Sequence, residues 1–275
     1  MEERKDQEVT SKQIESEEEE FELNHADKLV GVFTEPGNVF SSMSKFPPKV
    51  LDWLLPVILV IVLAALSNIV MMNNPTIKYD IIEKRMAQME ENLNKDVEAG
   101  TMTQEAADQR IEMTREFMEK NSTAGLVFQV VGIVVVVFIL FFVISGVWFL
   151  GVKFGLKGDG SYKSAMAAYG LPYYIAALQI IVMVILAFAM GKFMAGTSVA
   201  DIMGMEKDEF LGFLLSKADI FSIWFYAVLS IGLAKMFKSE ETGKYFAVVF
   251  GLWLGFSILF FFLAQKITFL KSFMM

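Results

Sequence analysis

The side chains best suited to catalysis and metal binding are scarce in this sequence. It contains no cysteine and a single histidine, His25. The lack of cysteine excludes disulfides, thiolate catalysis, iron–sulfur clusters and cysteine-based zinc sites. One histidine cannot form a two-histidine metal site, and it lies outside the apolar blocks where a Ser-His-Asp triad would be needed. We expect His25 to be solvated, and we predict no catalytic residue, no metal site, no cofactor and no enzymatic activity.

Two short motifs that could bind ligands do not have the required context. Gly158-Asp-Gly160 lacks the lysine-bearing spacing and the strand-to-helix setting of a phosphate loop. Glu206, Asp208 and Glu209 lack the alternation and the distal glutamate of a calcium loop. We interpret both as parts of polar connectors.

Three uncharged polar residues lie inside apolar stretches: Asn68, Gln129 and Gln179. Such groups usually form hydrogen bonds between membrane helices, and the alternative is that they line a pore. Asp52, Asp219 and Lys235 lie at the ends of apolar stretches, where they can reach the interface. Ion-coupled transporters and proton pumps generally need buried ionisable groups. Their expected absence argues against those mechanisms but not against an uncoupled channel.

The elements that carry these residues are predicted to be transmembrane helices. Hydrophobic residues make up 55% of the chain and occur in blocks separated by charged stretches. Two long apolar runs flank the polar turn 238–244, and a helix that is apolar all round for five turns belongs in lipid. The sequence predicts an all-α polytopic membrane protein. Its five crossings are expected at about 54–72, 126–149, 169–190, 220–237 and 245–264.

The ends of the crossings supply candidate interface and packing residues. Asp52 and Trp53 mark the start of the first crossing, and Asp219 and Trp224 the start of the fourth. Tryptophan favours headgroup depth, and Asp219 is expected to be an interface or capping group. Gly251 and Gly255 form a small-xxx-small motif, which we assign to packing within the chain, with a dimer face as the alternative.

Three segments outside the crossings have distinct patterns. Residues 1–27 carry 11 acidic and 3 basic side chains, which accounts for the whole net charge of −8 and predicts a disordered tail. Residues 28–49 predict an interfacial amphipathic helix capped by Thr34, or else a loop packed on the membrane domain. Residues 73–123 predict an antiparallel helical hairpin outside the membrane, in which Thr103 caps the second helix.

Basic residues set the expected orientation. With a cytoplasmic N-terminus, the inside connector 153–168 has three lysines and one aspartate, whereas the outside connector 192–219 has three lysines against five acidic residues. Positive charge favours the cytoplasmic side. We therefore predict an integral membrane protein with its N-terminus in the cytoplasm.

Several stretches, taken in order, resemble the Yip1-domain membrane proteins in their prokaryotic form, over about residues 30–265. They are Phe33-Thr-Glu-Pro-Gly-Asn-Val-Phe40, Ser161-Tyr-Lys-Ser-Ala-Met-Ala-Ala-Tyr-Gly-Leu-Pro172, Asp219-Ile-Phe-Ser-Ile-Trp224 with Gly232-Leu-Ala, and Gly243-Lys-Tyr-Phe-Ala-Val-Val-Phe-Gly-Leu-Trp253.

The resemblance implies five membrane helices, a cytoplasmic N-terminus and a prokaryotic cell (inner) membrane. Eukaryotic relatives are linked to vesicle trafficking and small GTPases and carry an Asp-Leu-Tyr-Gly-Pro motif. Because Val50-Leu-Asp-Trp53 stands near that place here, a GTPase partner is not carried over.

Three functional hypotheses follow. The first is a non-enzymatic Yip1-like scaffold that organises the membrane or binds partners. The alternative is a channel or uncoupled permease for a small solute. A membrane-embedded enzyme comes third, because no acid–base or metal constellation supports it. The expected partners are the lipid bilayer and either a second copy or another membrane protein, with no nucleic acid.

Overall fold

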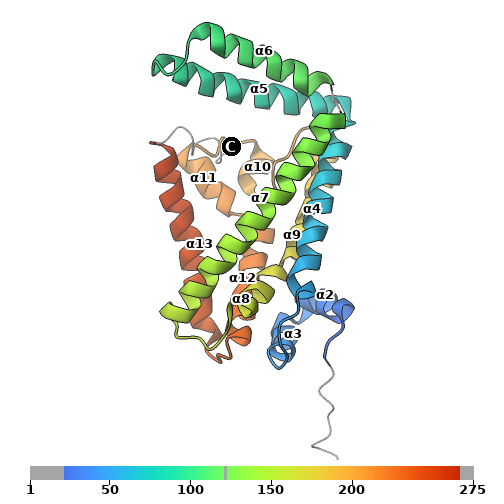
Figure 1. The fold of residues 1–275 in the computed structure, drawn as a ribbon, viewed down its shortest axis with the longest axis vertical. Helices are drawn as coiled ribbons and strands as arrows, with labels where there is room; N and C mark the ends of the chain where they lie inside the picture. The colour runs from blue at the N-terminus through green and yellow to red at the C-terminus, as the bar shows by residue number, and fades with distance from the viewer. Residues whose placement is uncertain (1–21, 121–122, 267–275) are drawn as a thin grey trace, which may run out of the picture.

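The computed structural model describes residues 22–120 and 123–266, and the side chains of residues 117–130 lie outside the description. All regular secondary structure in these residues is helical. The long helices run side by side along the molecule, and a helix pair lies across one end (Figure 1). This arrangement confirms the predicted all-α class.

The membrane-spanning part is a bundle of strongly apolar helices. They are α4 (Leu51–Met72), α7 (Thr123–Leu150), α8 (Tyr162–Gly170) with α9 (Tyr173–Met190), α12 (Ile220–Met236) and α13 (Thr242–Ala264). Four spans among the described residues are long and apolar enough to cross a bilayer, and α11 (Phe210–Lys217) with α12 forms a fifth that is bent by 55°. The protein is therefore a polytopic membrane protein with four or five crossings.

The third and fourth spans differ most from the sequence-based boundaries. The third begins at Tyr162 rather than near Tyr169, because α8 continues almost directly into α9. The fourth is preceded by α11, which the sequence analysis placed in a connector. Because α11 lies between the end of the bundle and Ile220, α12 begins inside the bundle rather than at its end.

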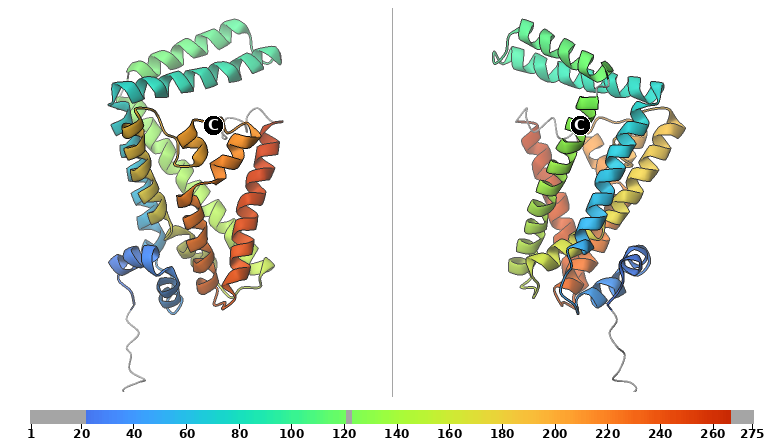
Figure 2. Two further views of the ribbon diagram at one scale, coloured as in Figure 1. Left: turned by 180° about the vertical axis from the view of Figure 1, so that it is seen from behind. Right: turned by 45° about the vertical axis from the view of Figure 1, so that its right-hand side comes forward.

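The connecting segments alternate between the two ends of the bundle. At one end lie α2 (His25–Thr34), α3 (Pro36–Met43), the π-helical turn η1 (Gly151–Gly155) and the turn between α12 and α13 (Figures 1 and 2). At the other lie α5 (Pro75–Glu98), α6 (Gln104–Lys120), α10 (Val199–Met203) and α11. Five crossings require this alternation.

The predicted hairpin insertion is present as α5 and α6, which pack antiparallel. Asn74 caps α5 by accepting from the backbone N–H groups of Thr76 and Ile77, and Thr103 caps α6 by accepting from that of Ala106. The pair lies across the end of the bundle rather than continuing along it (Figures 1 and 2). We call it the arm.

The base of the arm is fixed to the bundle. Ile77 and Ile81 of α5 are buried in a cluster that also contains Met71, Ala187 and Met194. In addition, the Asp80 carboxylate accepts a hydrogen bond of 2.6 Å from the backbone N–H of Phe193. Apolar packing and a charge-assisted hydrogen bond together hold the direction of the arm.

The segment before the first span forms two helices rather than one. Thr34 is the last residue of α2, and its hydroxyl donates to the carbonyl of Val30, so its predicted role as the cap of the next helix is wrong. Glu35 takes the N-cap position of α3. Residues 1–21 of the predicted tail lie outside the described residues, and the last residues of that tail form the start of α2.

Two glycines allow close contacts between helices of the bundle. A Cβ atom at Gly170 would lie 2.2 Å from the Cβ of Trp53, and one at Gly232 would lie 2.8 Å from the ring of Phe40. Phe40 is fully buried, so α3 is docked on α12 by an aromatic side chain that fills the space left by Gly232. A side chain at either glycine would force the helices apart.

Candidate functional site

The most unusual polar site lies at the break between α11 and α12. Asp219 stands in the break and caps α12 by accepting from the backbone N–H of Phe221 at 3.3 Å. Its side chain is almost completely buried, with 4% of the residue exposed. The capping role expected from the sequence is therefore present, and the carboxylate is buried in the protein rather than exposed at its surface.

The carboxylate of Asp219 is held by uncharged side chains. Oδ1 accepts from the hydroxyl of Thr197 at 2.8 Å, and Oδ2 accepts from Gln179 Nε2 at 2.8 Å and from the hydroxyl of Ser222 at 2.6 Å. Gln179 Nε2 also lies 3.0 Å from the Thr197 hydroxyl. The four hydrogen bonds come from α9, from the loop before α10 and from α12, so this Asp219 cluster joins three parts of the chain.

The cluster lies well inside the apolar part of the bundle. Gln179 is 11 residues before the end of α9 at Met190, or about 16 Å along the helix at 1.5 Å per residue. The span to which it belongs starts 17 residues earlier, at Tyr162. The expectation that ionisable groups lie only at span ends is therefore wrong for Asp219. The overlooked signal was the apolar run Phe210–Leu215 just before it.

Asp52 is also buried rather than exposed at an interface. The ammonium group of Lys28 lies 2.7 Å from Asp52 Oδ1, and both side chains are only 4% exposed. The backbone N–H of Lys49 donates to Asp52 Oδ2 at 2.9 Å. This ion pair joins α2 to the start of α4, and Lys28 could not be recognised as the partner of Asp52 from the sequence because the two residues lie 24 positions apart.

His25 contacts the bundle instead of solvent. Its Nε2 atom shares a hydrogen bond of 2.5 Å with the hydroxyl of Tyr174. Burial lowers the pKa of His25 below its ordinary value of 6.5, and Lys28 lowers it further, while Asp52 acts in the opposite direction. The expectation of a solvated histidine is therefore wrong.

The three predicted intramembrane polar residues do not form one site. Gln179 belongs to the Asp219 cluster, and Asn68 is a half-buried residue of α4 that takes no part in that cluster. Gln129 belongs to α7, but its side chain lies outside the described residues. Only Gln179 thus has the hydrogen-bonding role between elements that the sequence suggested.

The two candidate interface tryptophans are half-buried and pack on other aromatic rings. Trp53 stacks on Phe141 of α7, with ring centroids 5.0 Å apart. Trp224 contacts Phe33 of α2 edge-to-face at 5.6 Å. Both therefore connect helices, and Trp224 helps to dock the N-terminal segment.

Gly251 and Gly255 do not pack against any described residue. A Cβ atom at either position would meet no atom within 4 Å, and both glycines are exposed on α13. The preferred assignment to intramolecular packing is therefore wrong, because the close approaches occur at Gly170 and Gly232 instead.

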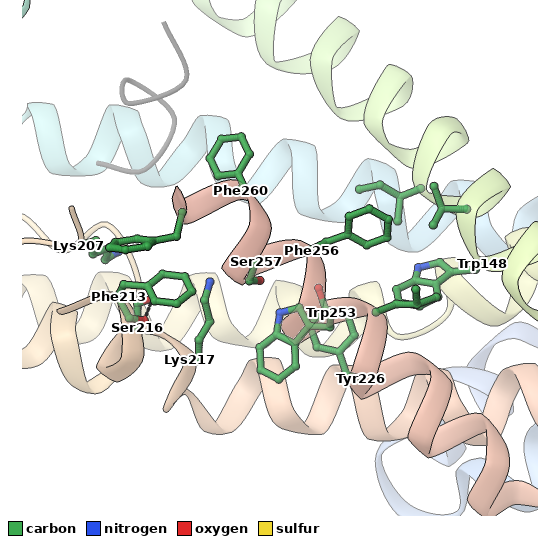
Figure 3. A pocket seen from close by; sticks show the side chains of 14 residues that line it. Trp148, Lys207, Phe213, Ser216, Lys217, Tyr226, Trp253, Phe256, Ser257 and Phe260 are labelled. Carbon is green, nitrogen blue, oxygen red and sulfur yellow. Dashed lines mark hydrogen bonds between the residues drawn. The ribbon is translucent and has the colours of Figure 1, made fainter. Parts of the chain in front are cut away.

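A cavity of about 540 Å³ opens between α7, α11, α12 and α13 (Figure 3). Half of the residues in its wall are aromatic, among them Trp148, Tyr226 and Trp253. Lys207 and Lys217 lie at one end. This site could not be recognised in the sequence, because its residues come from four separate stretches.

The carboxylates of the described residues do not gather into a metal site. Within residues 22–120 and 123–266, no three His, Cys, Asp or Glu side chains are grouped closely enough to hold a metal ion. The Asp219 cluster supplies one carboxylate among hydroxyl and amide groups, and its hydrogen bonds hold α9, the loop before α10 and α12 together.

Comparison with known proteins identifies the family. No curated protein matches the chain. No solved structure matches it either. The Yip1 domain, in contrast, matches residues 30–264, which includes α3, every span and the arm. The chain therefore belongs to the Yip1 domain family.

Proposed function

We propose that this protein is a non-enzymatic membrane scaffold that organises partners at the bilayer, and that the arm is its docking surface. The arm is the observation that carries the proposal. It lies across the end of the bundle, fixed at its base by the Ile77 and Ile81 cluster and by the Asp80 hydrogen bond.

The exterior of the arm suits a protein partner better than lipid. Residues 73–123 contain 7 basic and 11 acidic side chains, and Tyr79 is 70% exposed. Exposed aromatic groups beside mixed charges are common in protein interfaces, where tyrosine often contributes strongly to affinity. The partner that we propose is a second copy or another membrane protein, in a prokaryotic cell membrane.

Photo-crosslinking in native membranes tests this proposal. A photoreactive amino acid at Tyr79 should form a crosslink to protein, whereas the same group at Ile139 of α7, which is 57% exposed on the apolar surface, should react only with lipid. A product of twice the mass identifies a second copy. Equal yields of protein crosslinks from the two positions would contradict a docking role for the arm.

A channel or uncoupled permease remains the second candidate, and the Asp219 cluster favours it. Buried ionisable groups and broken helices within a membrane often belong to transport sites. Flux through purified protein in liposomes that is lost in Asp219→Asn would support this function and overturn the scaffold proposal. The absence of flux for a panel of ions and small solutes would argue against the permease.

A further inference from the structure

The aromatic cavity has the shape and position of a lipid site. It follows α13 from Leu252 to Phe261, while α7 and α13 diverge toward the end that carries the arm (Figures 1 and 2). Phe256 lines the cavity and is 54% exposed, so the cavity reaches the lipid-facing surface of α13. Its volume of about 540 Å³ lies within the range of roughly 300–1,000 Å³ that is typical of ligand sites.

One end of the cavity carries an excess of positive charge. Lys207 forms an ion pair of 2.7 Å with Asp201. Lys217 has no ion pair with any described residue, and its ammonium group lies 5.0 Å from the centre of the Phe213 ring. A half-buried ammonium against an aromatic wall is incompletely solvated, so it favours an anionic ligand.

Apart from Ser216 and Ser257, the rest of the cavity wall is formed by apolar and aromatic side chains. Trp253 and Phe256 of α13 lie between the lysine end and Trp148 of α7, which closes the far end (Figure 3). These side chains offer an acyl chain extensive contact but give an inorganic anion almost no partner. The observed combination, cationic at one end and aromatic along its length, fits an amphiphile.

We propose that this cavity binds one membrane lipid with an anionic phosphate headgroup. The phosphate lies at Lys217 and Lys207, and one acyl chain lies along α13 toward Trp148. The lipid comes from the leaflet on the side of the arm, because Lys217 belongs to α11, which lies toward that end of the bundle (Figure 1). This inference is independent of partner docking, since the cavity is separate from the arm.

Native mass spectrometry of the full chain tests the proposal. Protein purified in mild detergent is mixed with equal amounts of phosphatidylglycerol and phosphatidylcholine, and retained lipid is counted. We expect one phosphatidylglycerol per chain, retained at least fivefold over phosphatidylcholine. Lys217→Gln should reduce that preference to less than twofold. The matched control, Lys192→Gln, alters a lysine at the same end that contacts the Ile202 carbonyl outside the cavity and should retain the preference.

A second variant separates charge from shape. Ser257 lines the cavity, and Ser257→Phe should fill the path of the acyl chain and reduce retention of both lipids while leaving the lysines in place. Equal retention of the two lipids by the unaltered protein would overturn the proposal, as would equal losses in Lys217→Gln and Lys192→Gln. Release of the lipid by millimolar inorganic phosphate would overturn the role of the acyl chain, since the site would then recognise phosphate alone.

Discussion

Two buried carboxylates show different ways of keeping a charge inside this protein. Asp52 is neutralised by Lys28 at 2.7 Å, whereas Asp219 has three side-chain donors and one backbone donor, none of them charged. When one partner of a buried ion pair is removed, the charge of the other partner is left uncompensated in the interior. A cluster of neutral donors loses its hydrogen bonds one at a time. The two sites should therefore respond differently to substitution.

Breaking the Lys28–Asp52 pair should release the N-terminal segment from the bundle. Asp52→Leu leaves the ammonium group of Lys28 buried without a partner, and Lys28→Met leaves the carboxylate of Asp52 in the same state. Either change should cost about 3–5 kcal/mol of stability. Hydrogen exchange in α2 and α3 should rise in both single variants. The double variant should recover much of the protection, because no charge stays buried. If hydrogen exchange in α2 and α3 is as fast in the double variant as in either single variant, this account is contradicted.

Substitution of Asp219 should lower stability in a graded way. Asp219→Ala leaves the Thr197, Gln179 and Ser222 donors without their acceptor, at about 1–3 kcal/mol for each buried group. Asp219→Asn retains one acceptor oxygen and should lie between Ala and the unaltered protein in a thermal melt. Asp159→Ala, at an exposed aspartate, is the control and should have no effect.

Docking of α2 should weaken at acidic pH through His25. Its pKa is lower in the docked state than the ordinary 6.5, mainly because burial disfavours the charged ring. The undocked state then binds more protons as the pH falls below 6.5, so docking is strongest above that pH and is lost toward the docked-state pKa. Hydrogen exchange of α2, corrected for intrinsic rates, should therefore increase from pH 7.5 to pH 5.5. His25→Gln should remove this change, and a persistent change would assign it to another group.

At the scale of elements, close approach between helices is decided by individual glycines. Gly170 lets α8 approach Trp53 of α4, whereas Gly251 faces away from the rest of the described chain. Sequence motifs alone do not distinguish these situations, because both glycines occur in apolar helices. Only the neighbour across the contact decides what an added methyl group does.

The matched pair Gly170→Ala and Gly251→Ala tests this distinction. In the first, the new Cβ would lie 2.5 Å from the backbone Cα of Trp53, which cannot move like a side chain, so overpacking should cost about 1–3 kcal/mol or more. In the second, the methyl group meets no atom within 4 Å, and the higher helix propensity of alanine should leave stability unchanged or raise it slightly. Thermal melting in detergent measures both, and equal losses would contradict the packing argument.

At the scale of the whole molecule, the arm and the α12–α13 turn lie at opposite ends of the bundle (Figure 1). One span separates α2 from the arm and four separate α2 from the turn, so the turn shares the side of α2 and the arm faces the opposite compartment. The basic residues of the connectors favour the cytoplasm for the turn. The absence of cysteine makes the orientation easy to measure by single-cysteine labelling.

A membrane-impermeant maleimide should label Tyr79→Cys in intact cells and Gly243→Cys only after permeabilisation. Tyr79 is 70% exposed on the arm, and a side chain at Gly243 meets no atom within 4 Å. The cysteine-free protein is the blank. The reverse pattern would place the N-terminus outside, and labelling of both residues from one side would contradict five crossings.

The sequence by itself determined the helical class, the location in a membrane and the approximate limits of most spans. It could do so because burial in lipid requires a helix that is apolar all round, and that requirement is local. The hairpin arm and its Thr103 cap were also predictable, since helical periodicity and capping depend on neighbouring residues.

Only the tertiary structure decided where the polar groups lie. Asp219 is buried because α11 folds against the bundle before α12 begins. Asp52 is buried because α2 places Lys28 against it. The lysine and aromatic residues of the cavity meet only when α7, α11, α12 and α13 pack together. These contacts join residues that are distant in the chain, so no local pattern encodes them, whereas the spans follow from composition within single segments.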